Sequence, residues 1–408
     1  MKMKTKIEVI ADGNVTSAKG FSAGATYAGI KHKSKDALDL SILYSEASCN
    51  AAAVFTTNKI QAAPVILDRE KLEKTGKARA VIINSGCANA CTGEEGLANA
   101  KTTASWAAKY LKIKPAEVMV ASTGVIGVQL PMDKIQAGIP HIKLSVAGGK
   151  DLTHAIMTTD TRPKAIAFKV SVGDIAFTIG GVAKGAGMIH PDMATMLCFI
   201  TTDAVVSAPF LKASLKKAVS ASFNMVSVDG DTSTNDTALI MASGLAGNQT
   251  ITSTSELAGP FQEALLKVCV HLAKCIARDG EGATRMIEIQ VNGAKTLRDA
   301  RLAARTISSS PLVKTAVHGC DPNWGRIIAA AGRSGCALVP EKSDVYIGAA
   351  CLLKSGMPLP FDKKAVSALL DAPEVFLRVE LNLGDYQATA WGCDLSEEYV
   401  VVNAEYTT

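Results

Sequence analysis

Aromatic side chains, long apolar runs and a large excess of one charge are scarce or absent in this sequence. Phe, Trp and Tyr make up 5% of the 408 residues, and 43 basic and 38 acidic residues are scattered along the chain. The sequence therefore has few aromatic side chains for base stacking and no basic stripe, and nucleic-acid binding is not indicated. No run of about 18 uncharged apolar residues occurs, so no membrane-spanning helix is predicted. Glu8 and Asp12 stand where a signal peptide would have its apolar core, and we expect a cytoplasmic protein.

Metal-binding patterns are also missing. The ten cysteines lack the density of a small secreted scaffold, so we expect them to be reduced. Cys87 and Cys91 lie four positions apart, but no second pair with ligand spacing follows, and one pair cannot complete a tetrahedral site. The segment beginning at Asp229 starts like a calcium loop, yet Thr234 replaces the obligatory glycine and Ile240 the bidentate glutamate. No metal site is predicted.

The composition is that of an ordinary globular protein, with 48% hydrophobic and 20% charged residues. This length suggests two or three domains. Apolar periodicity predicts alternating strands and helices in a mixed α/β fold. The main strands are expected at 80–83, 118–121 and 165–179, and the main helices at 97–111, 211–225 and 261–277. From residue 286 onward, strand-like runs alternate with helices expected at 324–335 and 363–370, and we place a second, smaller domain there.

The stretch from Lys184 to Ala204 is the strongest candidate for chemistry. A glycine-rich loop there meets an apolar run, Met196–Ile200, that predicts a short buried strand. Thr195 stands at the junction. On spacing alone it is only a β-branched residue that begins a strand. A threonine hydroxyl becomes a nucleophile when a base adjoins it, and cleavage before Thr195 would supply its own α-amine, which titrates near ~8.

Six segments make this chain resemble the ornithine acetyltransferase family, also called the glutamate N-acetyltransferases. In chain order they are NSGCANACTG from Asn84, STGVIG from Ser122, TTDT from Thr158, KGAGMIHPDMATMLCFITTDA from Lys184, DGDTSTNDT from Asp229 and DPNWGRI from Asp321. Together they span nearly the whole chain in the family's order. The resemblance implies a four-layer α/β/β/α sandwich at 1–285 and a smaller α/β domain at 286–408. It also implies self-cleavage between Ala194 and Thr195, giving chains 1–194 and 195–408.

The resemblance further implies roles for individual residues. Thr195 would be the nucleophile, and the Thr123 hydroxyl and the Gly124 N–H would form the oxyanion hole. Substrate contacts would come from Thr158, Lys184, Thr195, Glu281, Asn403 and Thr408. Glu281 suits an ammonium group, whereas the lysine, hydroxyls and amide suit a carboxylate. Because Thr159 and Thr161 flank Thr158 closely, which of the three threonines meets the substrate stays open.

The implied reaction is acetyl transfer from N2-acetyl-L-ornithine to L-glutamate in cyclic arginine biosynthesis. The mechanism would be ping-pong through acetyl-Thr195, without a metal or organic cofactor, and the sequence leaves open whether acetyl-CoA also serves as a substrate. The cleaved chains would stay together in an α2β2 heterotetramer. Two alternatives remain. An N-terminal-nucleophile amidase or aminopeptidase would pass the acyl group to water, and a non-catalytic amino-acid-binding protein would stay uncut.

Supporting roles are expected for several polar segments. His190 is expected to fix its loop, and the DGDTSTND segment at 229–236 is expected to brace the active-site loops through hydrogen bonds. Asn323, with Asp321 and Arg326, is typical of a turn and helix cap. The run at 399–402 predicts a strand, which would bring the polar C-terminal residues to the site and help to exclude water.

Overall fold

The computed structural model describes residues 5–31, 37–190 and 196–405. Within them, nine strands form one sheet in the order β1-β6-β7-β8-β10-β3-β4-β5, with β2 paired to β3. The strands are β1 (Thr5–Val9), β2 (Phe21–Thr26), β3 (Leu40–Phe55), β4 (Lys77–Cys87), β5 (Val118–Val125), β6 (Lys164–Val172), β7 (Ile175–Lys184), β8 (Leu197–Thr202) and β10 (Thr237–Ala242).

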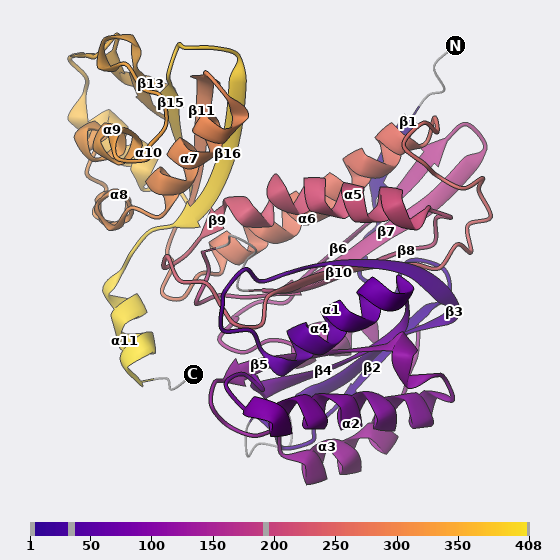
Figure 1. The fold of residues 1–408 in the computed structure, drawn as a ribbon. Coiled ribbons are helices and arrows are strands. Elements are labelled where there is room, and N and C mark those ends of the chain that lie inside the picture. Colours follow the sequence, from indigo (N-terminus) through magenta and orange to yellow (C-terminus); the bar gives the residue numbers. More distant parts are fainter. Residues whose placement is uncertain (1–4, 32–36, 191–195, 406–408) are drawn as a thin grey trace.

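Strand β3 joins the two halves of this sheet. Its residues 40–44 pair with β4 and its residues 50–55 pair with β10, and an irregularity in register lies between Tyr44 and Cys49. The sheet bends there, so that one half lies over the other (Figure 1). Val81 of β4 and Phe199 of β8 share one core between the halves, although they belong to opposite layers. The bend therefore creates two packed β layers from one sheet.

Alternating side chains attach a helical layer to each outer face, as the two-residue period of a strand requires. In β4, Val81 points to the inner core whereas Ile82 packs toward α1 (Ala63–Thr75) and α2 (Gly93–Leu111). In β8, Phe199 points inward whereas Ile200 packs in the cluster that contains α5 (Ala208–Ser220) and α6 (Ala258–Arg278). The predicted four-layer α/β/β/α sandwich is confirmed. The short helices α3 (Met132–Gly138) and α4 (Gly149–Ala155) complete it.

A second sheet of seven described strands has the order β14-β13-β12-β15-β11-β16-β9. Its strands are β9 (Val226–Ser227), β11 (Met286–Ala294), β12 (Asp344–Ile347), β13 (Ala350–Lys354), β14 (Met357–Pro358), β15 (Glu374–Glu380) and β16 (Tyr386–Cys393). The helices after β11 are α7 (Leu297–Ser308), α8 (Pro311–His318), α9 (Trp324–Gly332) and α10 (Lys363–Leu370), and 3-10 helices lie at Pro115–Glu117, Ile139–His141, Phe223–Met225 and Pro340–Lys342. One apolar cluster runs from α6 into this sheet. The boundary at 285/286 stays a prediction.

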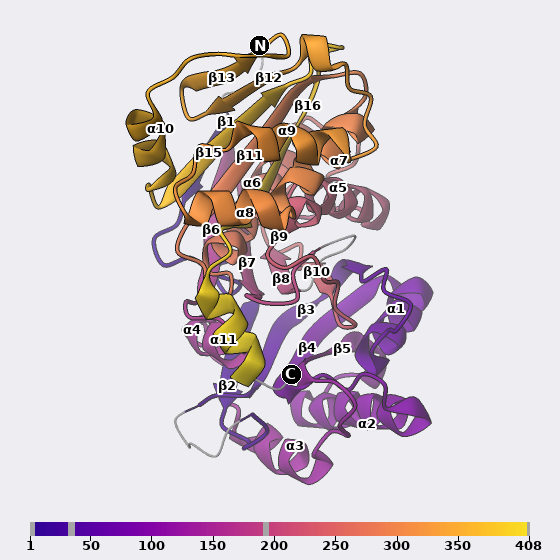
Figure 2. The ribbon, with the colours of Figure 1, turned by 90° about the vertical axis from the view of Figure 1, so that its left-hand side faces the viewer.

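The last helix, α11 (Glu397–Glu405), leaves the second sheet and lies beside the sandwich (Figures 1 and 2). The predicted strand at 399–402 is wrong. Glu397 and Glu398 occupy the first turn of α11, where carboxylates are favoured by the helix dipole. The valines that suggested a strand have no sheet to join, since Val400 is 64% exposed.

Besides α11, four helices were not predicted, although two of them carry start signals. Thr296 accepts a hydrogen bond from the Asp299 amide at the start of α7, and Ser310 caps α8 immediately before a proline. The other two, α1 and the short α3, have no side-chain cap. The predicted helix at 211–225 ends earlier, because α5 stops at Ser220. The cap at Asn323 is confirmed, since its side chain accepts from the Arg326 amide.

Candidate active site

One cavity gathers residues that lie far apart in the sequence. It opens where the C-terminal ends of β5 and β7 meet the loop after α6 and the helix α11. Six residues predicted for the site line it: Thr123, Gly124, Thr158, Lys184, Glu281 and Asn403. Ala194, Thr195 and Thr408 lie outside the described residues. Thr195 is nevertheless bonded to Met196, which is buried and precedes β8.

Gly124 stands at the end of β5, where only glycine fits. Its φ is +130°, and a Cβ there would come within 2.3 Å of the Gly86 carbonyl carbon in the neighbouring strand. The β4–β5 register is irregular at this point. The backbone of Gly124 therefore faces the cavity without a side chain in the way.

The neighbouring Thr123 hydroxyl meets a lysine. The Lys184 ammonium donates to Thr123 Oγ1 at 3.3 Å. Because the oxygen accepts this bond, the hydroxyl keeps its own hydrogen for another acceptor in the cavity. Thr123 and Gly124 thus line the cavity side by side, one with a hydroxyl and the other with its backbone.

Lys184 is the last residue of β7 and is only 6% exposed. It is therefore not a solvated surface lysine. Burial lowers the pKa of Lys184, against the opposing charge of Asp160, and the nearby charge of Lys164 lowers it further. A buried amine with one hydroxyl partner is available to a carboxylate ligand that enters the cavity.

A buried charge cluster lies behind Lys184. Lys164 Nζ is 2.6 Å from Asp160 Oδ1 and 2.5 Å from Asp279 Oδ2, and all three side chains are almost fully buried. Asp160 also accepts from the Gly185 amide at 2.6 Å and the Thr158 amide at 3.0 Å. Burial alone would raise the pKa of Asp160, but the charges of Lys184 and Lys164 and the Gly185 N–H hold it at about 2. The cluster was not predicted.

The same cluster narrows the choice among the three threonines. The Thr161 hydroxyl and amide both donate to Asp279, so its polar groups are already occupied. Thr158 and Thr159 instead line the cavity. Thr158 and Thr159 are therefore the two candidates for a substrate contact.

Glu281 forms the opposite wall, close to the glycine loop. A Cβ on Gly187 would lie 2.3 Å from the Glu281 carboxyl group, so the loop approaches closely only because residue 187 is glycine. The Glu281 amide donates to the Ala186 carbonyl at 3.0 Å, and Asn403 Nδ2 of α11 donates to Glu281 Oε2 at 2.9 Å. The C-terminal helix thus reaches the cavity through Asn403.

The predicted bracing role of the segment 229–236 is confirmed by its hydrogen bonds. Asp229 accepts from the amides of Met188 and Ile189 at 2.5 and 2.8 Å, which holds the glycine loop. Asn235 donates to the carbonyls of Ala88 and Ser122 at 2.6 and 2.8 Å, just before Thr123. His190 has its predicted loop-fixing contact too, because its Nδ1 lies 3.1 Å from Ser227 Oγ.

Asp236 holds the peptide that follows Thr195. Its Oδ1 accepts from the Met196 amide at 2.9 Å, and burial raises the pKa of this carboxyl group well above its ordinary value. Its Oδ2 is buried and has no hydrogen-bond partner among the described residues. The sequence showed Asp236 only as part of a polar segment, so this contact was not predicted.

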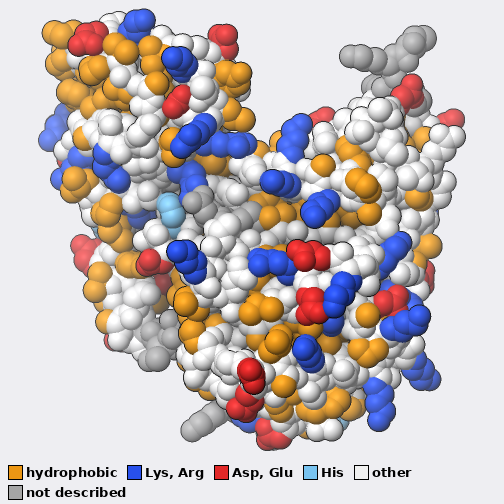
Figure 3. All heavy atoms as spheres, in the orientation of Figure 1, with side chains coloured by type: hydrophobic (Ala, Val, Ile, Leu, Met, Phe, Trp, Pro, Cys, Tyr) orange, Lys and Arg blue, Asp and Glu red, His pale blue; other side chains and the backbone are white. Residues whose placement is uncertain are grey.

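The described ranges, 5–31, 37–190 and 196–405, offer neither a cluster of metal ligands nor a membrane span. No group of three or more His, Cys, Asp or Glu within them is placed to hold a metal ion. All ten cysteines are free. In the same ranges no helix is both long and apolar enough to span a bilayer. The face drawn in Figure 3 mixes basic, acidic and apolar side chains.

The sandwich and its cavity, lined by hydroxyls, a buried lysine and a carboxylate, define an α/β enzyme for a small polar substrate. Residues 22–408 match the model of the ArgJ family. The arginine biosynthesis bifunctional protein ArgJ of Dehalococcoides mccartyi is 55% identical over 406 residues, covering 100% of both chains. Its counterpart from Symbiobacterium thermophilum is 50% identical, covering 97% of this chain and 99% of that one. The crystal structure of ArgJ from Bacillus halodurans is 45% identical, with a TM-score of 0.49, covering 50% of this chain and 97% of that chain.

The chain belongs to the ArgJ family of arginine biosynthesis enzymes. The family indicated by the six sequence segments is thereby confirmed.

Proposed function

We propose that this chain is a self-cleaving acetyltransferase that moves an acetyl group from N2-acetyl-L-ornithine to L-glutamate. The convergence of Thr123, Lys184, Glu281 and Asn403 on one cavity carries the proposal. This cavity contains groups for both ends of an amino acid. The relatives' name, arginine biosynthesis bifunctional protein, supports the pathway.

The reaction would begin with hydrolysis of the Ala194–Thr195 bond, in which water adds to the Ala194 carbonyl, leaves a carboxylate on Ala194 and frees the α-amine of Thr195. This amine takes the proton of the Thr195 hydroxyl as Oγ attacks the acetyl carbonyl carbon. The Thr123 hydroxyl and the Gly124 N–H stabilise the tetrahedral oxyanion. The proton then passes to the departing amine, and ornithine leaves. In the second half-reaction the glutamate amine attacks acetyl-Thr195, and Oγ regains its proton.

Substrate recognition divides between two walls of the cavity. Glu281 would accept from a substrate ammonium group, with Asn403 holding its other side. Lys184 and Thr158 would bind a carboxylate, because the burial of Lys184 leaves little water to compete for it. Thr408 would add a further contact from the C-terminus.

Further parts of the proposal rest on the relatives and on composition. Since the relatives are called bifunctional, acetyl-CoA is proposed as a second acetyl donor for the first half-reaction. No metal or organic cofactor takes part in the scheme. The two cleaved chains are proposed to remain one unit within an α2β2 heterotetramer. A reducing cytoplasm suits the ten free cysteines.

The test measures where the acetyl group goes. Purified protein is incubated with labelled N-acetylornithine, with and without glutamate, and released ornithine, N-acetylglutamate and acetate are quantified. The proposal predicts that N-acetylglutamate accounts for most of the ornithine released when glutamate is present. Acetate as the main product under both conditions would instead favour an amidase. Amino-acid binding without any release would favour a binding protein.

A further inference from the structure

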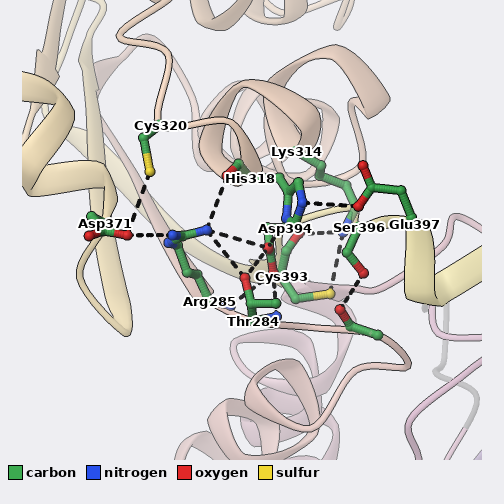
Figure 4. A network of polar contacts seen from close by, with 11 residues as sticks. Thr284, Arg285, Lys314, His318, Cys320, Asp371, Cys393, Asp394, Ser396 and Glu397 are labelled. Atoms are coloured by element: carbon green, nitrogen blue, oxygen red, sulfur yellow. Dashed lines mark hydrogen bonds and ion pairs between the residues drawn. The ribbon is translucent and has the colours of Figure 1, made fainter.

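Asp394 forms a hub behind the active site, at the junction between β16 and α11 (Figure 4). Its side chain is fully buried. The carboxylate accepts from the amides of Thr284 and Arg285, both at 2.8 Å, and from the Thr284 hydroxyl at 2.5 Å. His318 Nδ1, at the end of α8, lies 2.8 Å from Asp394 Oδ2. One carboxylate therefore joins the loop after α6, the end of α8 and the start of α11.

The charge of this carboxylate is well compensated. Burial would raise the pKa of Asp394, but the Thr284 hydroxyl, His318 and two backbone amides outweigh burial and lower it. The Arg285 guanidinium lies 3.9 Å away. Hydrogen bonds to a charged carboxylate are stronger than those between neutral groups, so Asp394 connects these segments firmly.

The hub lies three residues from Glu281 along the chain, through Thr284. The intervening Gly282 is held by the same junction, because Ser396 Oγ donates to the Gly282 carbonyl at 2.5 Å. Gly282 has a φ of +67°, and a Cβ there would lie 2.4 Å from the Tyr399 nitrogen in the first turn of α11. The Glu281 loop is thus clamped between Asp394 and α11.

Helix α11 makes few other contacts that would fix its position. None of its described residues is buried, so hydrophobic packing contributes little to its position. Its polar contacts lie at its two ends. Glu397 Oε2 lies 3.3 Å from His318 Nε2 at the start, and Asn403 bonds Glu281 near the end. The Asp394 hub therefore sets where α11 begins and where its partner Glu281 stands.

We propose that Asp394 is a positioning residue for the active site: it aligns Glu281 and Asn403 against each other and thereby sets the affinity for the amino-acid substrate. It touches no substrate itself. The inference rests on the proposed function, because that function makes Glu281 a substrate contact. Its effect on α11 is measurable without any substrate.

The experiment compares Asp394→Asn with a matched control, Asp344→Asn. Asp344, in β12, is buried as well, and it accepts from Lys354 Nζ at 2.7 Å and from the Ser355 amide at 2.8 Å. Neither partner belongs to the Glu281 loop or to α11. Both substitutions remove one buried charge. The rate of amide hydrogen exchange in 281–285 and 397–405 measures how firmly the Glu281 loop and α11 are held. Steady-state kinetics give KM and kcat for both amino-acid substrates.

The expected result for Asp394→Asn is at least tenfold faster exchange in both segments and a rise in KM of about tenfold, with kcat changed less than threefold. Asp344→Asn should leave the exchange of these segments and KM within twofold of wild type. Wild-type exchange and KM in Asp394→Asn, or an equal rise in KM in the control, would overturn the proposal. If the wild type shows no acetyl transfer, the proposed function fails, while the exchange result still decides the positioning role.

A second variant tests the proposal if Asp394→Asn does not fold. Ser396→Ala keeps the carboxylate and removes only the bond to the Gly282 carbonyl. This variant should raise KM about threefold and speed exchange at 281–285. An unchanged KM together with unchanged exchange would refute the clamp independently of Asp394.

Discussion

Replacing Asp160 by asparagine tests whether the buried charges behind Lys184 stabilise the folded protein. Asp160 is charged in the fold and bonds Lys164 Nζ and the amides of Thr158 and Gly185. Asparagine keeps the size and one acceptor but removes the charge. Lys164 would then share a buried site with one aspartate instead of two.

The magnitude follows from the pKa of Asp160, which is about 2 in the fold. Against an ordinary value of about 3.9, the charged form contributes about 2 to 3 kcal/mol, since one pH unit corresponds to about 1.4 kcal/mol. Removing one partner of a buried ion pair costs about 3 to 5 kcal/mol. We therefore expect Asp160→Asn to lower the free energy of unfolding at pH 7 by about 2 to 5 kcal/mol.

The stabilisation that Asp160 contributes should also depend on pH. Because the folded pKa of Asp160 is depressed, its stabilisation is complete above the unfolded pKa and is lost as the pH falls toward about 2. Between pH 5 and pH 3 the contribution should fall by about 1 kcal/mol. The stability difference between wild type and Asp160→Asn should therefore shrink by that amount over this range.

Urea unfolding followed by circular dichroism at pH 7, 5 and 3 measures both effects. Glu70→Gln is the control, since Glu70 forms an exposed ion pair with Lys74 on α1, and exposed pairs contribute little. Its unfolding midpoint should match that of wild type. An Asp160→Asn protein with the wild-type midpoint, or a difference that stays constant from pH 7 to pH 3, would refute the reasoning.

Three further substitutions probe the cavity. Thr123→Ala should lower kcat about a hundredfold with little change in KM, because the hydroxyl acts mainly in the transition state, and unchanged turnover would move the oxyanion hole elsewhere. Gly187→Ala should raise KM, because the added Cβ forces the Glu281 side chain aside. Gly259→Ala, whose added Cβ has no neighbour within 4 Å, should leave KM unchanged. Equal KM values for the two variants in steady-state assays would contradict this expectation. Deleting 404–408 should leave self-cleavage intact but raise the share of acetyl lost to water, measured as ornithine released against N-acetylglutamate formed, and an unchanged ratio would remove the C-terminus from the site.

Much of the sandwich could be predicted from local sequence. The apolar runs at 80–83 and 118–121 are too short for helices and lie between turn residues, so strands were the natural expectation, and the structure has β4 and β5 there. The same reasoning predicted a strand at 399–402, and that prediction is wrong. Its valines favour a strand only when a neighbouring strand is available, and α11 stands alone beside the sandwich, with no buried residue.

The site could be predicted in part, and the division has a physical cause. Segment resemblance indicated the residues that line the cavity, and the polar segment 229–236 indicated one brace for their loops, but nothing in the sequence indicated the buried charges behind them. Lys164 and Asp279 are 115 positions apart and meet only in the fold. Charges carry no periodic signal as apolar faces do, so neither this pair nor the Asp394 hub could be expected from the chain. A single lysine gives no local signal of burial, and the burial of Lys184 became visible only with β7 inside the sandwich.

Thr195 can become an N-terminal nucleophile only if the chain is cut before it, and the intact mass of the purified protein measures this cut. We expect two fragments, 1–194 and 195–408, and a single added acetyl group on the second fragment after brief exposure to N-acetylornithine. Thr195→Ala should remain one uncut and inactive chain, whereas Thr195→Ser should cut and retain some activity. A fully active protein that remains one chain of 408 residues, or acetylation on the first fragment, would show that Thr195 is not an N-terminal nucleophile.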